Sequence, residues 1–248
     1  LPLPQAQSDH GLSSPQEWCE MQSPSVFCIT PELYRIQREI ASRTILEDWI
    51  SLDQIELVAG VDQAFLRGGD DEGEMIISAV VVLEYPSMKP LDSSYAILTV
   101  DFPYIPGLLT FREAPSIIEA FSSLDRKPDI LFVDGCGINH PRFAGLATHV
   151  GVTLDIPTVG VAKSILCGEG DLPVEEGDAS IITYRGREVG YYLKSKKGCK
   201  PIIVAPGHKI SPESSLKLVK SCIRGYKLPE PTRIAHLLAN KIKRDGGS

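Results

Sequence analysis

The chain contains 248 residues, of which 43% are hydrophobic and 23% are charged. These values are ordinary for a globular protein with one large or two small domains, and this length can bury a hydrophobic core. No run approaches the ~18 apolar residues of a membrane span, and a secretory signal pattern is absent from the first residues. The six cysteines lack metal-binding spacing, so we expect free thiols and an intracellular protein of the cytoplasm or nucleus, without a membrane partner.

The net charge of −7 is unevenly distributed along the chain. Residues 1–184 hold 10 Lys and Arg against 28 Asp and Glu, whereas residues 185–248 hold 15 against 4. An acidic body with a basic C-terminal quarter suits a protein that holds metal in one region and binds an anion with another. A solvated helix face beside a basic surface patch is the alternative interpretation.

The predicted elements begin after residues 1–30, a segment rich in Ser, Pro and Gln that we expect to be a poorly ordered lead-in to a single domain over 31–248. Residues 31–49 are predicted to form an amphipathic helix with Thr30 as N-cap and Pro31 at its first position. Apolar runs at 56–66 and 75–85, joined by a turn at 68–74, predict a β-hairpin. The remaining expected elements are strands over 94–101, 129–134, 157–161, 188–194 and 201–205 and helices over 115–125, 142–152, 211–222 and 231–244.

This order of elements indicates the fold class. Three consecutive strands are followed by alternating strands and helices, which predicts an α/β protein with a mixed sheet. The later strands, such as 129–134, are continuous apolar runs, which suits a sheet covered by helices on both faces.

Three carboxylates occupy positions that are unusual for surface acids. Asp62 lies inside an apolar strand, Asp134 ends another, and Glu113 precedes the predicted start of a helix. A carboxylate within an apolar strand is costly unless it is paired or binds a cation. If the three converge at one sheet edge, they make an oxygen-rich site suited to Mg²⁺ or Mn²⁺. Taken singly, each could instead be a capping or surface acid.

Two cationic or titratable side chains follow predicted strands. Lys163 comes directly after a buried strand and could stabilise a developing negative charge, although a solvated loop lysine is an equal alternative. His208 follows another strand and could position or deprotonate water. The glycines of residues 134–142 could suggest a dinucleotide loop, but His140 occupies the third glycine position of that motif.

The loop Pro103-Tyr104-Ile105-Pro106 is stiffened by two prolines and presents an aromatic tip. It could simply cover the core. Its functional interpretation is a wedge that enters stacked bases, as rigid apolar side chains do when an enzyme extracts a base.

Taken together, these segments resemble the endonuclease V family. The matching motifs occur in the family's order over roughly residues 30–230, and the ordered set is specific although each motif alone is weak. They are GVD at 60–62, PYIPG at 103–107, FRE at 111–113, DGCG at 134–137, HPR at 140–142, GVAK at 160–163 and GH at 207–208. Cys136 departs from the pattern, because the family more usually has a polar residue there.

The resemblance implies a ribonuclease H-like mixed β-sheet flanked by helices and a Mg²⁺-dependent endonuclease that acts on inosine-containing single-stranded RNA or DNA, with Mn²⁺ able to substitute. The implied product ends are a 3′-hydroxyl and a 5′-phosphate, from cleavage of the second phosphodiester bond 3′ to inosine. The implied metal-binding and catalytic carboxylates are Asp62, Glu113 and Asp134, supported by Lys163 and His208. The implied substrate-binding residues are Pro103, Tyr104, Ile105, Pro106, Gly107, Gly135, Gly137 and His140.

The residues themselves support the same mechanism. A cation held by the carboxylates could activate water, and backbone N–H groups around Gly135 to Gly137 could donate to the hypoxanthine oxygen. Lysines of the basic quarter would bind the phosphate backbone of the substrate, and we expect a monomer. Two other hypotheses stay open: an inosine-binding module that does not cleave, and a nuclease that acts on hybrid duplexes.

Overall fold

The computed structural model describes residues 24–66 and 73–246, which divide into two units, residues 1–36 and 37–248. The described part of the first unit is the beginning of helix α2 (Pro24–Ser42), where Arg35 pairs with Glu32 at 2.5 Å. The helix begins before Thr30 and has Pro31 in its interior, so the predicted N-cap is wrong. Most of the lead-in 1–30 and of the turn 68–74 lies outside the described residues.

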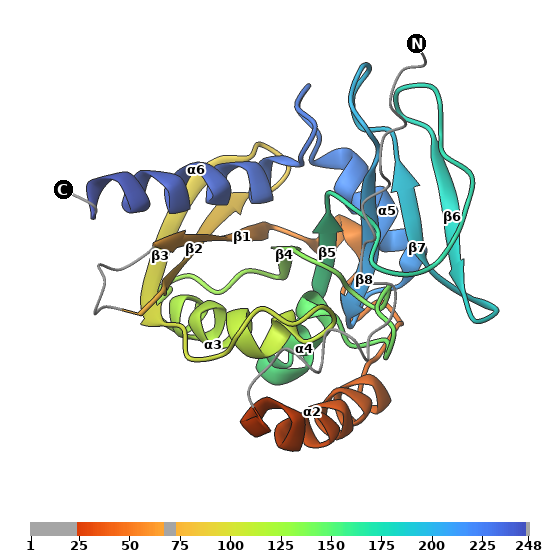
Figure 1. Ribbon diagram of the computed structural model, residues 1–248. Helices are drawn as coiled ribbons and strands as arrows, with labels where there is room; N and C mark the ends of the chain where they lie inside the picture. Colours follow the sequence, from red (N-terminus) through yellow and green to blue (C-terminus); the bar gives the residue numbers. More distant parts are fainter. Residues whose placement is uncertain (1–23, 67–72, 247–248) are drawn as a thin grey trace, which may run out of the picture. The chain divides into compact units, whose positions relative to one another are not determined.

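The second unit is built around an eight-stranded mixed sheet in the order β3-β2-β1-β4-β5-β8-β7-β6 (Figure 1). Strands β1, β4 and β5 are parallel to one another, and the other neighbouring pairs are antiparallel. The strands span Leu57–Leu66 (β1), Met75–Glu84 (β2), Lys89–Thr99 (β3), Ile130–Asp134 (β4), Thr158–Ala162 (β5), Ala179–Tyr184 (β6), Arg187–Leu193 (β7) and Ile202–His208 (β8). The mixed α/β sheet and the β1–β2 hairpin expected from the sequence are thus confirmed.

Helices cover both faces of this sheet. Helices α3 (Leu109–Ser122) and α4 (Leu146–Leu154) pack on one face, and α5 (Pro212–Ser221) and α6 (Glu230–Asp245) pack on the other (Figure 1). Successive strand residues alternate between these two apolar layers, as the pleat of a strand requires. A short 3₁₀ helix, η1 (Leu52–Gln54), precedes β1.

The predicted start was correct for one helix, α5, and wrong for another, α3. The α5 start was correct: Ser211 is the N-cap, and its side chain accepts a hydrogen bond from the Ser214 N–H at 3.1 Å. Helix α3 instead begins at Leu109 and contains Pro115, which the sequence pattern had placed at the first position. Glu113 therefore lies inside α3 rather than before it.

Strand β6 was not among the elements predicted from the sequence. It forms a hairpin with β7 through Arg185 and Gly186, both with positive φ angles of 51° and 72°. A two-residue turn of this kind between β-branched and aromatic runs is a hairpin signal, so the sequence did contain the information. Across the described ranges, none of the helices combines the length and the apolar character needed to cross a bilayer.

Candidate active site

Two neighbouring parallel strands carry carboxylates side by side. Val61 of β1 pairs with Val133 of β4, so Asp62 is adjacent to Asp134 at the edge where β4 ends. Asp62 is only 4% exposed, and the Asp134 side chain is 14% exposed. Strand alternation directs both side chains toward the face that packs against α5 and α6.

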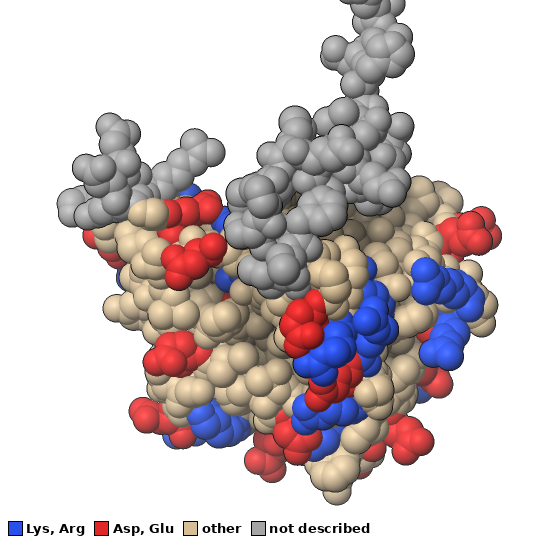
Figure 2. All heavy atoms as spheres, turned by 60° about the horizontal axis from the view of Figure 1, so that its bottom comes forward, with Lys and Arg blue, Asp and Glu red and all other residues tan. Residues whose placement is uncertain are grey.

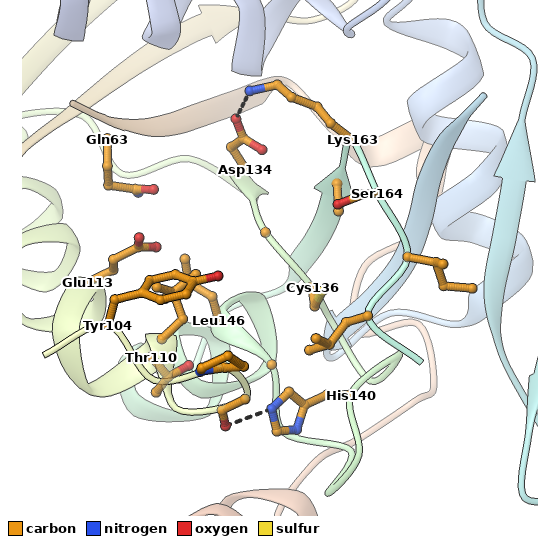
Figure 3. A pocket seen from close by; sticks show the side chains of 18 of the residues that line it. Gln63, Tyr104, Thr110, Glu113, Asp134, Cys136, His140, Leu146, Lys163 and Ser164 are labelled. Carbon is orange, nitrogen blue, oxygen red and sulfur yellow. Dashed lines mark hydrogen bonds and ion pairs between the residues drawn. The ribbon is translucent and has the colours of Figure 1, made fainter. Parts of the chain in front are cut away.

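The third carboxylate comes from the other side of the sheet. Glu113 lies in α3, is 7% exposed, and lines the same cavity as Asp62 and Asp134 (Figure 3). This cavity has a volume of about 430 Å³. The structure thus brings the three predicted carboxylates together, and we call them the acid end of the cavity.

Crowding and burial disfavour ionisation at the acid end. Burial, followed by the charge of Asp134 and a hydrogen bond with it, raises the pKa of Asp62 to about 6. Burial, followed by the charge of Asp134, raises the pKa of Glu113 to about 8. If all three carboxylates were ionised, they would carry more negative charge than the protein neutralises, and a bound cation would relieve this excess.

Two side chains partly compensate that charge. The Lys163 Nζ lies 2.6 Å from Asp134 Oδ2; burial alone would lower the pKa of Lys163, but the adjacent carboxylate raises it. The Nδ1 atom of His236 lies 2.5 Å from Asp62 Oδ2. Lys163 was predicted from the sequence, whereas His236 was not assigned a role.

His236 reaches Asp62 because α6 packs unusually close to β1. A Cβ atom on Gly60 would lie 2.0 Å from the Pro231 carbonyl oxygen, so only glycine admits the start of α6 at this distance. Ala235 and Ala239 are fully buried on the sheet side of α6, and His236 follows the first of them. The small residues at Gly60, Ala235 and Ala239 were the only sequence signal for this contact, and they do not identify the partner strand.

The acid end has the chemistry of a Mg²⁺ site without being arranged as one. Within residues 24–66 and 73–246, no group of three or more His, Cys, Asp or Glu side chains is already positioned to hold a metal ion. Carboxylate oxygens are nevertheless the ligands that this hard cation takes, and the raised pKa values indicate uncompensated charge. The residues therefore fit Mg²⁺, which would compete with Lys163 for Asp134.

His208 does not belong to this group, which corrects the sequence prediction. It pairs with Thr158 at the start of β5, whereas Lys163 follows the end of that strand, about 17 Å away at ~3.3 Å per residue. Its Nδ1 accepts the Ile45 N–H at 3.3 Å, and burial lowers its pKa. The histidine of the GH motif thus lies at the opposite sheet edge, because β8 is antiparallel to β5.

The other end of the cavity is formed by loops. The predicted wedge residue Tyr104 is 64% exposed at the rim, and its loop is held through Gly107. The Gly107 carbonyl accepts hydrogen bonds from Arg142 Nη2 at 2.7 Å, Gln37 Nε2 at 2.9 Å and His140 Nε2 at 3.0 Å. We call Tyr104, Gly107, His140 and Arg142 the loop end of the cavity.

His140 serves first to hold this loop. Its Nε2 donates to Gly107, and its Nδ1 accepts the Arg142 N–H at 3.2 Å (Figure 3). Burial, followed by the positive charge of Arg142, lowers the pKa of His140 to about 4. The ring is therefore neutral, both of its nitrogens are already engaged within the fold, and its contact with substrate stays a prediction.

The predicted donors of the glycine loop are also engaged. The Gly135 N–H donates to Val161 O at 3.2 Å, and the Gly137 N–H donates to Asn139 Oδ1 at 2.9 Å. A Cβ on Gly137 would lie 2.2 Å from the Pro206 carbonyl oxygen, so this glycine permits close chain packing. The fold thus already uses these two N–H groups, and a contact between the backbone of residues 135–137 and the base stays a prediction.

One hydroxyl at the cavity has no such engagement. Thr110 is 2% exposed and lines the cavity, and its Oγ1 has no hydrogen-bond partner among the described residues (Figure 3). A buried hydroxyl without a partner is costly, so it is available to a ligand atom.

The lysines Lys194, Lys196, Lys197 and Lys200 lie in the connection between β7 and β8. Ile202 and Ile203, at the start of β8, pair with the ends of β7 and β5, so this connection is at the same sheet edge as Lys163. On the face drawn in Figure 2, basic and acidic side chains are interspersed, so that face is not uniformly basic.

Comparison with known proteins agrees with this architecture. The chain matches the sequence model of the family described as Endonuclease V over residues 38–237. The crystal structure of the Streptomyces avermitilis endonuclease V is 33% identical with a TM-score of 0.80, and the match covers 88% of this chain and 94% of that one. The catalytic domain of human endonuclease V is 26% identical with a TM-score of 0.80, covering 91% and 98%.

A third similar structure contains nucleic acid. Endonuclease V of Ciona intestinalis, crystallised with a 24mer DNA containing an inosine followed by a ribo-adenosine, is 26% identical with a TM-score of 0.74, covering 87% and 98%. The sheet order and the helices on both faces are those of a ribonuclease H-like nuclease fold. Since the family model matches most of its length, this chain belongs to the endonuclease V family.

Proposed function

We propose that the protein is a metal-dependent endonuclease that recognises inosine in RNA or DNA and hydrolyses the second phosphodiester bond on its 3′ side, leaving a 3′-hydroxyl and a 5′-phosphate. The observation that carries this proposal is the convergence of Asp62, Glu113 and Asp134 in a cavity with an exposed tyrosine at its rim. The inosine-containing DNA bound by the Ciona relative supports the choice of substrate.

The acid end would hold the catalytic cation. Asp62, Glu113 and Asp134 are its proposed ligands, with Mg²⁺ as the expected ion and Mn²⁺ as a substitute. When bound, the ion would supply an activated water and neutralise charge on the phosphate and the leaving oxygen.

Lys163 and His236 have separate proposed roles beside the carboxylates. The Lys163 ammonium, now paired with Asp134, is half-exposed and free to turn toward the phosphate at the bond that is cut. His236 is a positioning residue: its Nδ1–H would donate to Asp62 and fix the orientation of that carboxylate.

The loop end would receive the displaced base. Tyr104 projects at the rim, and the three hydrogen bonds to Gly107 hold its loop in place, as separating stacked bases requires. Hypoxanthine presents a carbonyl oxygen where adenine presents an amino group. The Thr110 hydroxyl is our replacement for the glycine N–H donors that the fold has used.

Cleavage of matched oligonucleotides tests the proposal. Single-stranded RNA and DNA, each carrying one inosine or one adenosine at the same position, are end-labelled and incubated with protein and Mg²⁺. We expect cutting of the inosine strands only, at the second bond 3′ to inosine, and none by the Asp134→Asn variant. Inosine-selective binding without cutting would instead favour the non-cleaving module, and equal cutting of both strands would contradict inosine recognition.

A further inference from the structure

An open groove of about 990 Å³ adjoins the cavity between Glu113 of the acid end and the rim residue Tyr104. The two hollows share Phe65, Tyr104, Leu109 and Glu113, so they are continuous. In Figure 3, Glu113 lies on the opposite side of the cavity from Cys136 and His140. A strand whose base lies beside His140 can therefore pass Glu113 and continue into this groove, which we call the α6 groove.

Helix α6 connects the carboxylates to the groove. His236, Asn240 and Lys243 are spaced by four and three positions, so they lie along one side of the helix. His236 contacts Asp62, and Lys243 lines the groove. The seven residues between them correspond to about 10.5 Å of helix, at ~1.5 Å per residue. Helix α6 therefore places Lys243 at a defined distance along its axis from His236, which contacts the proposed cleavage site through Asp62.

Among the described residues of the groove wall, Arg112 and Glu74 are a pair of opposite charges that compensate each other. Arg112 forms an ion pair with Glu74 and donates to the Phe102 carbonyl oxygen at 2.7 Å. Its guanidinium also lies 4.8 Å from the centre of the Phe65 ring. Outside the acid end, the exposed Lys243 ammonium is therefore the remaining charge among the described residues of the groove wall, and an anion is the ligand it suits.

We propose that the α6 groove binds the substrate strand beyond the bond that is cut, with Lys243 contacting a backbone phosphate. This inference rests on the proposed function, which places the cut 3′ to the recognised base, and so it assigns the groove to the 3′ side. The contact is with phosphate, which every nucleotide carries, and is therefore independent of base sequence.

Lys241 provides a matched control for Lys243. It has the same charge, is exposed on the same helix, and lies two residues away, which is about 200° around the helix axis. It therefore points away from the groove. Lys243→Gln and Lys241→Gln remove the same charge from α6, and neither removes a buried group.

The test compares inosine oligonucleotides with one or six nucleotides beyond the expected cut. Affinity is measured without divalent cation, so the result does not depend on cleavage. We expect Lys243→Gln to reduce the long-to-short affinity ratio about tenfold, the equivalent of one phosphate contact of ~1.4 kcal/mol, and Lys241→Gln to keep the wild-type ratio. The salt dependence of binding to the long strand should also fall by about 0.7 in log–log slope for Lys243→Gln.

Equal ratios for the three proteins would overturn the groove assignment, as would an equal loss in both lysine variants. The cleavage assay with the long strand separates this outcome from failure of the proposed function. If the wild-type protein cuts at inosine but the long-to-short affinity ratio is the same in all three proteins, the groove assignment alone is contradicted. If the wild-type protein does not cut, the proposed function is contradicted, and the affinity ratio still tests whether the groove binds the strand.

Discussion

The two ends of the cavity are built in opposite ways. The acid end is formed by regular strands and a helix, and burial, followed by the charge of the neighbouring Asp134, raises the pKa of Glu113 to about 8. The loop end is irregular, yet its polar atoms satisfy one another: the Gly107 carbonyl alone accepts three hydrogen bonds, and His140 is held neutral. The crowded carboxylates are thus held by the regular strands and helix, whereas the polar atoms of the loops form hydrogen bonds with one another.

This difference assigns each end a separate task. Unneutralised carboxylates are costly in the free protein and become favourable when a cation binds, so the acid end stores binding energy for a metal ion. A loop whose hydrogen bonds are already made can hold an aromatic side chain in position before substrate arrives. We therefore expect substitutions at the acid end to affect chemistry and those at the loop end to affect substrate entry.

The largest expected effect is on cleavage by Asp134→Asn. The substitution removes a proposed cation ligand and the partner of Lys163 while keeping the side-chain size. Single-turnover cleavage of an inosine oligonucleotide in Mg²⁺ should slow by at least about 10³-fold, the scale of losing a preorganised charge-stabilising group. The circular dichroism spectrum should match wild type, and a variant that cuts at a near wild-type rate would remove Asp134 from the metal site.

Next in size is a gain of stability in Glu113→Gln. Folded Glu113 has a pKa of about 8 against 4.5 ordinarily, so between these values the folded state binds the extra proton and stability falls as pH rises. In the absence of divalent cations, the variant should be more stable than wild type by about 2–4 kcal/mol at pH 8, with little difference at pH 4. Urea unfolding at both pH values measures this, and equal stability at pH 8 would show that the carboxyl is not strained.

The loop end should respond to pH in the opposite direction. Folded His140 has a pKa of about 4 against 6.5, so the unfolded state binds the extra proton and stability is lost as pH falls through this window. The contribution is about 2 kcal/mol at pH 5. His140→Asn should weaken the fold at pH 7 but lose less stability between pH 7 and pH 5 than wild type. Parallel pH profiles for the two proteins would contradict the neutral, buried ring.

A smaller effect distinguishes the roles open to Tyr104. If Tyr104 separates stacked bases, Tyr104→Ala should slow cutting of inosine in a duplex about tenfold more than in a flexible single strand, because extraction from a duplex costs a few kcal/mol. Stacking on the substrate in both settings would instead slow both alike. An unchanged ratio of the two rates rejects the wedge, and a large drop in melting temperature would indicate that the side chain supports packing.

Local sequence patterns were enough to predict the parts of the site that lie on strands. Asp62 interrupts an apolar run and Asp134 ends another. Once β1 and β4 are known to be parallel neighbours, the two side chains are expected to be adjacent. His236 could not be found in this way, because its contact depends on how closely α6 packs over Gly60, some 170 residues away in sequence. The same limit explains the error at His208, whose position depends on the antiparallel direction of β8.

The glycine loop shows a different limit. Glycines at positions 135 and 137 permit close approach to the backbone, but the sequence does not say by what. In the structure the close neighbour of Gly137 is the protein's own chain at Pro206, not a ligand. Both close chain packing and close approach of a ligand favour glycine, so the presence of glycine alone does not distinguish the two.

The melting temperature measured with and without Mg²⁺ shows most directly whether the acid end is a cation site. At pH 8, saturating Mg²⁺ should raise the melting temperature of the wild-type protein, because a ligand that binds the folded state stabilises it in proportion to its affinity. The same addition should leave Asp134→Asn unchanged, and Lys241→Gln, which lies outside the cavity, should respond like wild type. An equal response of all three proteins, or no response in the wild type, would show that the acid end does not bind the cation.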